Sequence, residues 1–242
     1  TKEIISILPT DSKDVLLLSL EEDGNAHLFA YIPNKLPLTR LTNGDWDDIQ
    51  PAPSPDGEKV AFASNRLGFW DLFLMDLSTG ELTRLTATPQ YEGAPTWSPD
   101  GSFLAYESYR NENLDVIIGP SDDPINGAIN LTTSSATDHS PAWAPGGRQI
   151  AFISNGEVIL ADLDRPDNSR FQNLSNTSYA LESHPVWSPD GSHLAWASES
   201  QNIGQSGIYV WDANTQLPAH WLGDGNLPAW NASGSQIFTT VP

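Results

Sequence analysis

Acidic side chains recur at one place in the sequence, shortly before a proline that opens a short extended segment. They stand in five separate segments: Asp45, Asp47 and Asp48; Glu92; Asp138; Glu182; and Asp224. If these segments lie side by side, the crowded carboxylates repel one another unless a cation or a basic group neutralises them. Calcium or another hard divalent cation suits such oxygen ligands. The alternative is that each acid hydrogen-bonds backbone N–H groups of its own loop.

Two histidines, His139 and His184, join the same segments just before their prolines. Together with Asp138 and Glu182 they could ligate a transition metal through imidazole and carboxylate groups. The two histidines stand at different offsets from their prolines, however, and no third histidine occurs in a neighbouring segment. The alternative is that they are polar side chains that line the site without binding a metal.

Trp46 lies among the first group of acids, where an exposed indole could anchor a peptide or stack on a sugar. Hydrolytic motifs are missing from the sequence: there is no Gly-x-Ser-x-Gly elbow, no His-Glu-x-x-His, no phosphate-binding glycine loop and no cysteine. Ser206 lies in a Gly-Gln-Ser-Gly stretch that we interpret as a hairpin turn. These patterns favour binding over hydrolysis.

The elements that position these residues repeat along the whole chain. An anchor residue recurs at intervals of 43 to 46 residues, at Leu8, Pro53, Trp97, Trp143, Trp187 and Trp230. Ser-Pro-Asp-Gly follows three of the anchors, and degenerate copies follow two more. A period of this length is typical of an array of one supersecondary unit. We place the repeats at 3–42, 49–86, 93–132, 139–175, 183–222 and 226–242.

Each repeat contains four short apolar runs rich in strand-forming residues. In the third repeat they are residues 95–98, 103–108, 114–118 and 129–132. Proline sets φ and glycine tolerates positive φ, so the Pro-Asp-Gly stretch after the first run predicts a tight turn. The anchor tryptophans are expected to pack between neighbouring sheets. No stretch has sustained helical periodicity, which predicts an all-β protein of four-stranded units.

The pattern Pro-x-Trp-Ser-Pro-Asp-Gly, then Ile/Leu-Ala-Phe, then Leu-Thr resembles the WD40-like PD40 repeat of TolB-type β-propellers. The resemblance covers nearly the whole chain and implies a single domain, 1–242, with six four-stranded antiparallel blades. It also implies that the acid-bearing loops surround one mouth of a central channel. Propellers of this type serve as protein docking platforms, peptidase gates and lyase scaffolds, the last with manganese, so the fold alone does not fix the activity.

The sixth repeat is expected to be incomplete, with only two strands, the second at 236–241. The first repeat already has its own innermost strand at 4–8, so nothing obvious completes the sixth. An unpaired edge carrying Ile237 and Phe238 would be a site for strand addition or self-association. Three explanations stay open: the chain is a fragment, the first segment pairs differently, or a partner supplies the missing strands.

The amino-acid composition limits the classes of partner that the chain can bind. The chain has 31 acidic and 11 basic residues, and its formal charge is −20. Such a surface repels nucleic acid and anionic membranes and attracts cations or a basic protein, although the charge can also serve only solubility. There is no cysteine, signal peptide or membrane-spanning run, so we expect a mature or trimmed soluble protein. The resemblance implies an extracytoplasmic location.

We therefore predict a non-enzymatic binding module that docks a basic protein or peptide at an acidic channel mouth. The predicted site comprises Trp46, Asp47, Asp48, Glu92, Asp138, His139, Glu182, His184 and Asp224. No cofactor is expected, although a divalent cation such as Ca²⁺ could lie in the channel. Two alternatives are a metal-dependent polysaccharide lyase that uses His139 and His184, and a structural subunit joined through the edge at Ile237 and Phe238.

Overall fold

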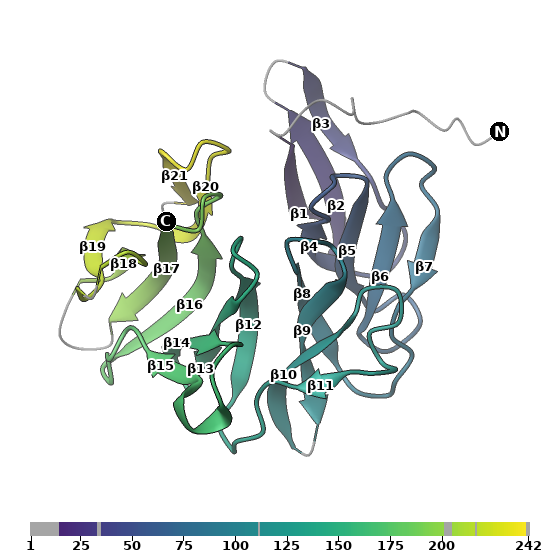
Figure 1. Cartoon of the computed structure of the whole chain (residues 1–242). Coiled ribbons are helices and arrows are strands. Elements are labelled where there is room, and N and C mark those ends of the chain that lie inside the picture. The colour runs from purple at the N-terminus through teal and green to yellow at the C-terminus, as the bar shows by residue number, and fades with distance from the viewer. Residues whose placement is uncertain (1–14, 33–34, 111, 201–204, 216, 241–242) are drawn as a thin grey trace. The chain divides into compact units, whose positions relative to one another are not determined.

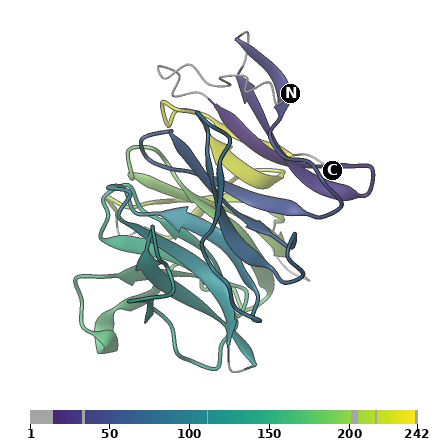
Figure 2. The same ribbon diagram turned by 90° about the vertical axis from the view of Figure 1, so that its right-hand side faces the viewer.

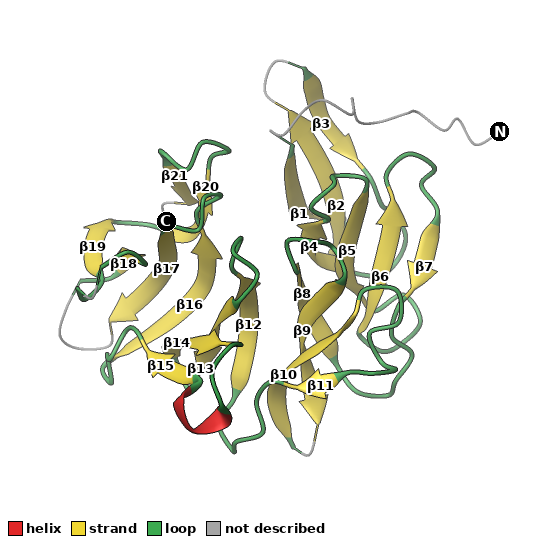
Figure 3. Cartoon of the chain, viewed as in Figure 1, coloured by secondary structure: helices red, strands yellow, loops and turns green. Residues whose placement is uncertain are grey.

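The computed structural model describes residues 15–32, 35–110, 112–200, 205–215 and 217–240. These residues form antiparallel β-sheets joined by loops, as Figure 3 shows in yellow and green. One short 3-10 helix, Asp167–Ser169, follows Pro166 and is drawn in red. Among the described residues no helix is long and apolar enough to cross a membrane. The all-β class predicted from the strand patterns is confirmed.

The chain divides into two compact units. The first unit comprises residues 1–112 and 117–131, and the second comprises residues 113–116 and 132–242. Each sheet corresponds to one repeat of the sequence, and the innermost strands β4, β8, β12 and β16 begin one to three residues before the predicted repeat boundaries. The expectation that residues 1–242 act as one domain stays a prediction.

The sheets in the first half of the chain are simple meanders (Figure 1). The first sheet has the order β1 (Leu16–Glu22), β2 (Asn25–Ile32), β3 (Leu36–Arg40). The second has the order β4 (Asp48–Pro53), β5 (Lys59–Ser64), β6 (Asp71–Asp76), β7 (Leu82–Arg84). The third contains β8 (Glu92–Trp97), β9 (Phe103–Arg110), β10 (Asn113–Pro120) and β11 (Ile129–Asn130).

The sheets of the second half follow the same plan. The fourth has the order β12 (Asp138–Trp143), β13 (Gln149–Ser154), β14 (Glu157–Asp162), β15 (Phe171–Asn173). The fifth has the order β16 (Ala180–Trp187), β17 (His193–Ser200), β18 (Gly207–Asp212), β19 (His220–Gly223). A two-stranded sheet follows, β20 (Asn226–Trp230) with β21 (Ile237–Thr240).

The strand count corrects one prediction. Six four-stranded blades were expected, with only the sixth incomplete. The described residues instead form five sheets of three or four strands and one sheet of two. The innermost strand expected at 4–8, with its anchor Leu8, and the end of the last expected strand at 241 lie outside the described residues.

The Ser-Pro-Asp-Gly turns have the predicted geometry. In the copy at Ser188, the serine hydroxyl donates to Asp190 Oδ1 at 2.6 Å, and the backbone N–H of Ser192 donates to the same oxygen at 3.0 Å. These hydrogen bonds, the serine bond first, lower the pKa of Asp190 to about 2. Gly191 has φ of 72°, which glycine adopts without steric cost. The motif therefore fixes the turn between the first two strands of a sheet.

The anchor tryptophans link neighbouring sheets, as expected. Their indole N–H groups donate to a backbone carbonyl of the preceding innermost strand: Trp97 to Ala52 at 3.0 Å, Trp187 to Ala142 at 3.1 Å and Trp230 to Val186 at 3.2 Å. Trp143 differs, because its indole N–H bonds the carbonyl of Gly147 in its own turn at 3.1 Å. The repeated indole thus fills space and also satisfies a backbone acceptor.

The outermost strands are shorter than predicted. The run expected at 129–132 ends as a strand at Asn130, and the corresponding strand of the second sheet ends at Arg84. The reason is a side-chain hydrogen bond: Thr86 Oγ1 accepts from the N–H of Leu72 at 2.8 Å, and Thr132 Oγ1 accepts from the N–H of Val116 at 2.9 Å. Here a hydroxyl replaces the backbone carbonyl that would have extended the ladder.

Apolar side chains pack between successive sheets of one unit. Leu28 of β2 packs with Val60 and Phe62 of β5 and with Phe73 and Met75 of β6. The strands within each sheet are twisted relative to one another, as the view turned by 90° shows (Figure 2).

Candidate functional site

The innermost strands β4, β8, β12, β16 and β20 share a β-bulge next to the predicted site residues. In each of these strands the pairing with the second strand of the sheet shifts register across the proline, between the residue two positions before it and the residue after it. The residue before the proline has a φ of 45° to 55°: Gln50, Ala94, Ser140, His184 and Leu227. A left-handed conformation is uncommon for residues other than glycine, and bulges re-aim the neighbouring side chains.

Four predicted acids lie at or near the start of these strands and are buried: Asp48, Glu92 and Asp138 are first residues, and Glu182 is the third residue of β16. Their exposed fractions are 0% for Asp48, 0% for Glu92, 2% for Asp138 and 4% for Glu182. Each acid is paired with a serine of the second strand of its sheet: Ser64, Ser108, Ser154 and Ser198. The bulge directs these carboxylates into the protein, so the expectation that they face a docked partner is corrected.

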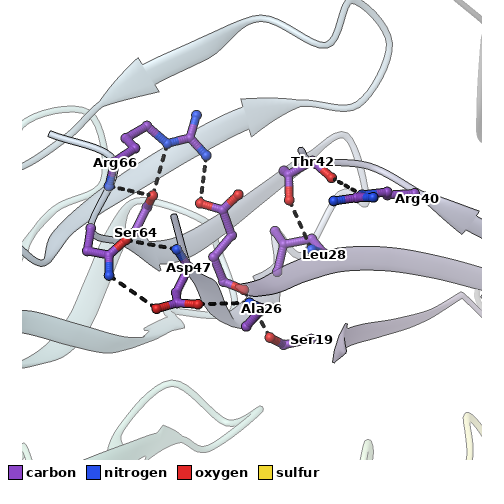
Figure 4. Close-up of polar contacts among 10 residues, drawn as sticks. Ser19, Ala26, Leu28, Arg40, Thr42, Asp47, Ser64 and Arg66 are labelled. Atoms are coloured by element: carbon purple, nitrogen blue, oxygen red, sulfur yellow. Dashed lines mark hydrogen bonds and ion pairs between the residues drawn. The ribbon is translucent and has the colours of Figure 1, made fainter. Parts of the chain in front are cut away.

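Asp48 forms an ion pair inside the first unit (Figure 4). Arg66 Nη2 donates to Asp48 Oδ1 at 2.7 Å, and Arg66 Nε donates to Ser64 Oγ at 2.9 Å. The guanidinium carbon also lies 4.8 Å from the ring centroid of Phe73. The side chains of Asp48 and Arg66 are only 0% and 11% exposed, so the pair is largely screened from water.

Asp47 and Trp46 have structural partners as well. Asp47 accepts hydrogen bonds from the N–H of Ala26 at 2.8 Å and from Asn65 Nδ2 at 3.2 Å, of which the first is marked in Figure 4. Asp47 therefore joins its loop to β2 and to the residue after β5, and neither of these bonds comes from a backbone N–H of its own loop, although the second interpretation of these acids had predicted such bonds. Trp46 is partly buried, and the guanidinium of Arg66 lies 5.3 Å from its ring. The prediction of an exposed indole anchor is corrected, because Arg66 covers this ring.

Glu92 occupies the corresponding place in the third sheet. Thr88 donates its hydroxyl to Glu92 Oε1 at 2.6 Å, and Arg110 Nε donates to Ser108 Oγ at 3.1 Å, as Arg66 does to Ser64. Burial raises the pKa of Glu92, and the negative charge of Asp71 adds to this effect. The carboxyl of Glu92 is thus held near another acid.

The sheets of Asp138 and Glu182 have no arginine at the position that Arg66 and Arg110 occupy in the second and third sheets. Gly156 and Ser200 stand there instead. Burial raises the pKa of both carboxyl groups, whereas hydrogen bonds from nearby hydroxyls oppose the shift. Thr177 donates one of these bonds to Glu182 Oε1. One buried oxygen of each acid, Asp138 Oδ1 and Glu182 Oε2, has no hydrogen-bond partner among the described residues. A raised pKa and an unpaired oxygen both favour the neutral acid here.

The two histidines lie on neighbouring strands, His139 on β12 and His184 on β16. His139 is partly buried and its Nδ1 lies 3.0 Å from Ser140 Oγ, whereas His184 is exposed. Partial desolvation and the charge of His139 lower the pKa of His184. Among the described residues no group of three or more His, Cys, Asp or Glu side chains is placed to hold a metal ion.

The remaining predicted residues belong to the two-stranded sheet and its approach. Asp224 is exposed, and Gly225 stands where the other repeats have the buried acid. Ile237 is partly buried, and Phe238 is 57% exposed. Phe238 stands at the position of alanines, such as Ala61 and Ala151, that are fully buried in the complete sheets.

Sequence reasoning missed the partners of the buried acids. They include the serines opposite each acid, the two arginines, and a second series of acids at the start of the third strands: Asp71, Asp115 and Glu157. Arg84 Nη2 forms an ion pair with Asp71 Oδ2 at 2.6 Å. The position of these serines is regular along the chain. Each serine stands four residues after the first buried residue of its strand, as Ser64 does after Val60.

An exposed apolar surface on the loops of the first unit was also missed. It consists of Leu67, Phe69 and Tyr109, which are 57%, 53% and 48% exposed. Trp70 and Tyr91 support it in an edge-to-face contact of 6.4 Å. We call Leu67, Phe69 and Tyr109 the apolar loop surface.

The support beneath the apolar loop surface is hydrogen-bonded. The N–H of Glu92 donates to the carbonyl of Trp70 at 3.0 Å, and the N–H of Tyr109 donates to the carbonyl of Tyr91 at 2.9 Å. The Tyr91 hydroxyl donates to Glu107 Oε1 at 2.6 Å, and burial is the first cause of the raised pKa of Tyr91. The surface can therefore present large side chains from fixed loops.

Comparisons with known proteins agree with this architecture. A TolB homologue of Chlorobium luteolum is 34% identical over 151 residues, which cover 44% of this chain and 35% of that protein. The crystal structure of TolB from Acinetobacter baumannii is 20% identical with a TM-score of 0.75, over 88% of this chain and 53% of that one. An oligogalacturonate lyase in complex with manganese is 15% identical with a TM-score of 0.51, over 93% and 77%.

These structural likenesses show the fold, an all-β propeller of antiparallel sheets. The chain matches only about a third of the length of the Chlorobium relative and about half of the Acinetobacter structure. The family model described as the TolB beta propeller domain, PD40, matches residues 8–160, which is more than half of the sequence. The chain therefore belongs to the PD40 family of TolB β-propeller domains.

Proposed function

We propose that this chain is a non-enzymatic module that docks a protein or peptide. The proposal is carried by the apolar loop surface, where Leu67 and Phe69 are exposed on the loop between β5 and β6 and Tyr109 is exposed near the end of β9. Aromatic side chains on a rigid support are enriched at binding hot spots. Membership of the TolB β-propeller family supports a binding role in general.

The partner is proposed to have basic character. The formal charge of −20 attracts a basic protein and accelerates its encounter. Because four of the predicted acids are buried, exposed acids must supply this attraction, and Asp45 and Glu112 are exposed in the first unit. Electrostatic attraction would bring the partner close, and the apolar loop surface would then hold it.

An extracytoplasmic location, in the bacterial periplasm or at the cell surface, is part of the proposal. It rests on the family resemblance. Lyase activity is not part of the proposal, because the likeness to the manganese-bound lyase is one of fold and the described histidines gather no third ligand.

Site-specific photo-crosslinking tests the docking proposal. A photoreactive amino acid at Phe69 should capture a defined partner, whereas the same group at Leu82, exposed on β7, should not. Binding of the purified partner should then weaken about tenfold or more with Phe69→Asp, because a buried aromatic contact is lost. Binding should also weaken as salt rises. Equal cross-linking at both positions, or an affinity unchanged by Phe69→Asp, would refute the proposal.

A further inference from the structure

Three asparagines in the sequence are followed by glycine: Asn43, Asn126 and Asn155. In such a pair the backbone nitrogen of the glycine can attack the side-chain carboxamide, because glycine has no side chain to obstruct the approach. The attack requires that the carboxamide and the glycine N–H are free to reach the reactive geometry. The hydrogen bonds around each pair therefore decide which of the three asparagines reacts in the folded protein.

Asn126 is held by the carboxylate of Asp123. Its Nδ2 donates to Asp123 Oδ2 at 2.7 Å, and its backbone N–H donates to Asp123 Oδ1 at 3.1 Å. These two bonds, the side-chain bond first, lower the pKa of Asp123, so this carboxylate stays ionised at neutral pH. The carboxamide of Asn126 must leave the carboxylate before the nitrogen of Gly127 can attack it.

Asn155 is held by the loop that precedes β12. Its Oδ1 accepts a hydrogen bond from the N–H of Thr137 at 3.1 Å, and its own N–H donates to the carbonyl of Thr137 at 3.1 Å. The carbonyl of Gly156 accepts from the N–H of Glu182 at 2.9 Å. Both residues of this pair are therefore fixed in the turn between β13 and β14.

The Asp-Gly pairs of the Ser-Pro-Asp-Gly turns are protected as well. The glycine N–H of each turn donates to the carbonyl of the serine that opens the turn, at 2.8 to 2.9 Å, in Gly57, Gly101 and Gly191. The serine hydroxyl is the first cause of a lowered pKa in each of the three aspartates. An ionised carboxylate is a poor electrophile, so neither reacting group is available in these turns.

The pair Asn43–Gly44 has none of this protection. It lies in the loop between β3 and β4, and the side chain of Asn43 is exposed. Within the part of the chain that the structure describes, neither the carboxamide of Asn43 nor the N–H of Gly44 has a hydrogen-bond partner. Both reacting groups of this pair are therefore free.

The fold also requires glycine at position 44. Its φ is 139°, and a Cβ at this position would overlap the indole ring of Trp46. The indole is itself covered by the guanidinium of Arg66, 5.3 Å from the ring centroid. The packing of Trp46 therefore keeps the residue after Asn43 without a side chain, which is the condition under which the attack is fastest.

We propose that Asn43 is a site of spontaneous deamidation in the folded protein. The nitrogen of Gly44 attacks Cγ of Asn43, the Cγ–Nδ2 bond breaks, and ammonia leaves with the proton of the Gly44 N–H. Water then opens the cyclic imide at either carbonyl and gives aspartate or isoaspartate. The reaction adds one negative charge beside Asp45, and isoaspartate also adds a methylene to the main chain next to the residue on which Trp46 packs. This modification site is independent of the proposed docking function.

Peptide mapping by mass spectrometry, after incubation at mildly alkaline pH, measures the three rates in one sample. In the native protein Asn43 should deamidate about tenfold or more faster than Asn126 and Asn155, because those two must first break hydrogen bonds. In urea the three rates should become similar, since each asparagine is followed by glycine and the fold no longer protects any of them. A native rate at Asn43 no faster than at the other two, or the same ranking with equal ratios in urea, would overturn the inference.

Two variants supply the matched comparison. Asn43→Gln should remove the modification at this position, because the longer side chain closes a six-membered ring far more slowly. Asp123→Ala, at an exposed position, releases the carboxamide of Asn126. It should raise the native rate at Asn126 toward that of Asn43 and leave Asn43 unchanged. A native rate at Asn126 that does not rise in Asp123→Ala would refute the role assigned to these hydrogen bonds.

Discussion

Arg66 neutralises Asp48 within the first unit, with Nη2 at 2.7 Å from Oδ1 and the guanidinium stacked 4.8 Å from the ring centroid of Phe73. The arginine therefore does three things at once: it pairs a buried carboxylate, it bonds Ser64, and it covers aromatic rings. Lysine could not reproduce this arrangement, because a compact ammonium lacks the planar fork of donors. This ion pair explains why the fold can bury the carboxyl group of Asp48 at the start of β4.

Removal of Arg66 should destabilise the protein strongly. Arg66→Ala leaves Asp48 buried and unpaired, and such a loss typically costs about 3 to 5 kcal/mol. The free energy of unfolding, measured with urea, should fall by that amount. The double variant Asp48→Asn with Arg66→Met should recover part of the loss, because it removes the uncompensated charge.

The control for Arg66→Ala is Arg148→Ala. Arg148 also pairs with an aspartate, Asp164, but the two side chains are 62% and 60% exposed. Exposed pairs contribute about 0 to 1 kcal/mol, so this variant should be nearly neutral. Equal losses for the two arginine variants would contradict the role assigned to burial.

Glu92→Gln should change how stability depends on pH. The pKa of Glu92 is raised above its usual 4.5 by burial, so the native state holds this proton to higher pH than the unfolded state. The group therefore stabilises the fold below the unfolded pKa, and this stability is lost as pH rises through the folded pKa. The variant lacks that loss, so its stability relative to the wild type should increase as pH rises above 4.5.

Urea unfolding over a pH series measures this difference. Glu58→Gln, which makes the same change at an exposed position in the turn before β5, is the control. Parallel pH profiles of wild type and Glu92→Gln would mean that Glu92 is not held in its neutral form.

Trp187→Phe should cost about 1 to 3 kcal/mol. The indole N–H donates to the carbonyl of Ala142 at 3.1 Å in a buried interface, and phenylalanine leaves that acceptor without its partner. Trp221→Phe is the matched control, because Trp221 is 36% exposed and its N–H bonds the carbonyl of Ser206 at 3.2 Å near the surface. Thermal unfolding should show a larger drop for Trp187→Phe, and the reverse order would refute the assigned role of the anchor.

The repeat period and the turns could be predicted from the sequence, because proline, glycine and tryptophan act through local geometry and size. Trp97 and Trp187 lie between sheets as their spacing predicted. The burial of Asp48 and Glu92 could not be predicted in the same way. It depends on a bulge whose left-handed residue is Gln50 in one strand and Ala94 in the next, and neither residue type signals positive φ.

The prediction made from the pattern of acidic residues was wrong for a related reason. The acids before the prolines were expected to surround the mouth of a channel and to attract a basic partner or a cation there. The interior here supplies hydroxyls, and Arg66 stands 18 residues from Asp48 on the adjacent hairpin. Only an alignment of the repeats with one another, including Ser64 and its equivalents, would have shown that each acid has a fixed partner inside the fold.

Calcium should have little effect on stability. The described acids at the bulges are buried and bonded, Asp48 to Arg66 and Glu92 to Thr88, and no three ligands gather to hold a cation. A cation that binds the native state stabilises it in proportion to the logarithm of its concentration over Kd. Thermal unfolding with EDTA and with millimolar calcium should therefore give the same midpoint. A midpoint that rises with calcium would show that exposed carboxylates such as Asp45 or Asp224 form a cation site in solution, and Asp45→Asn and Asp224→Asn would then identify which acid contributes.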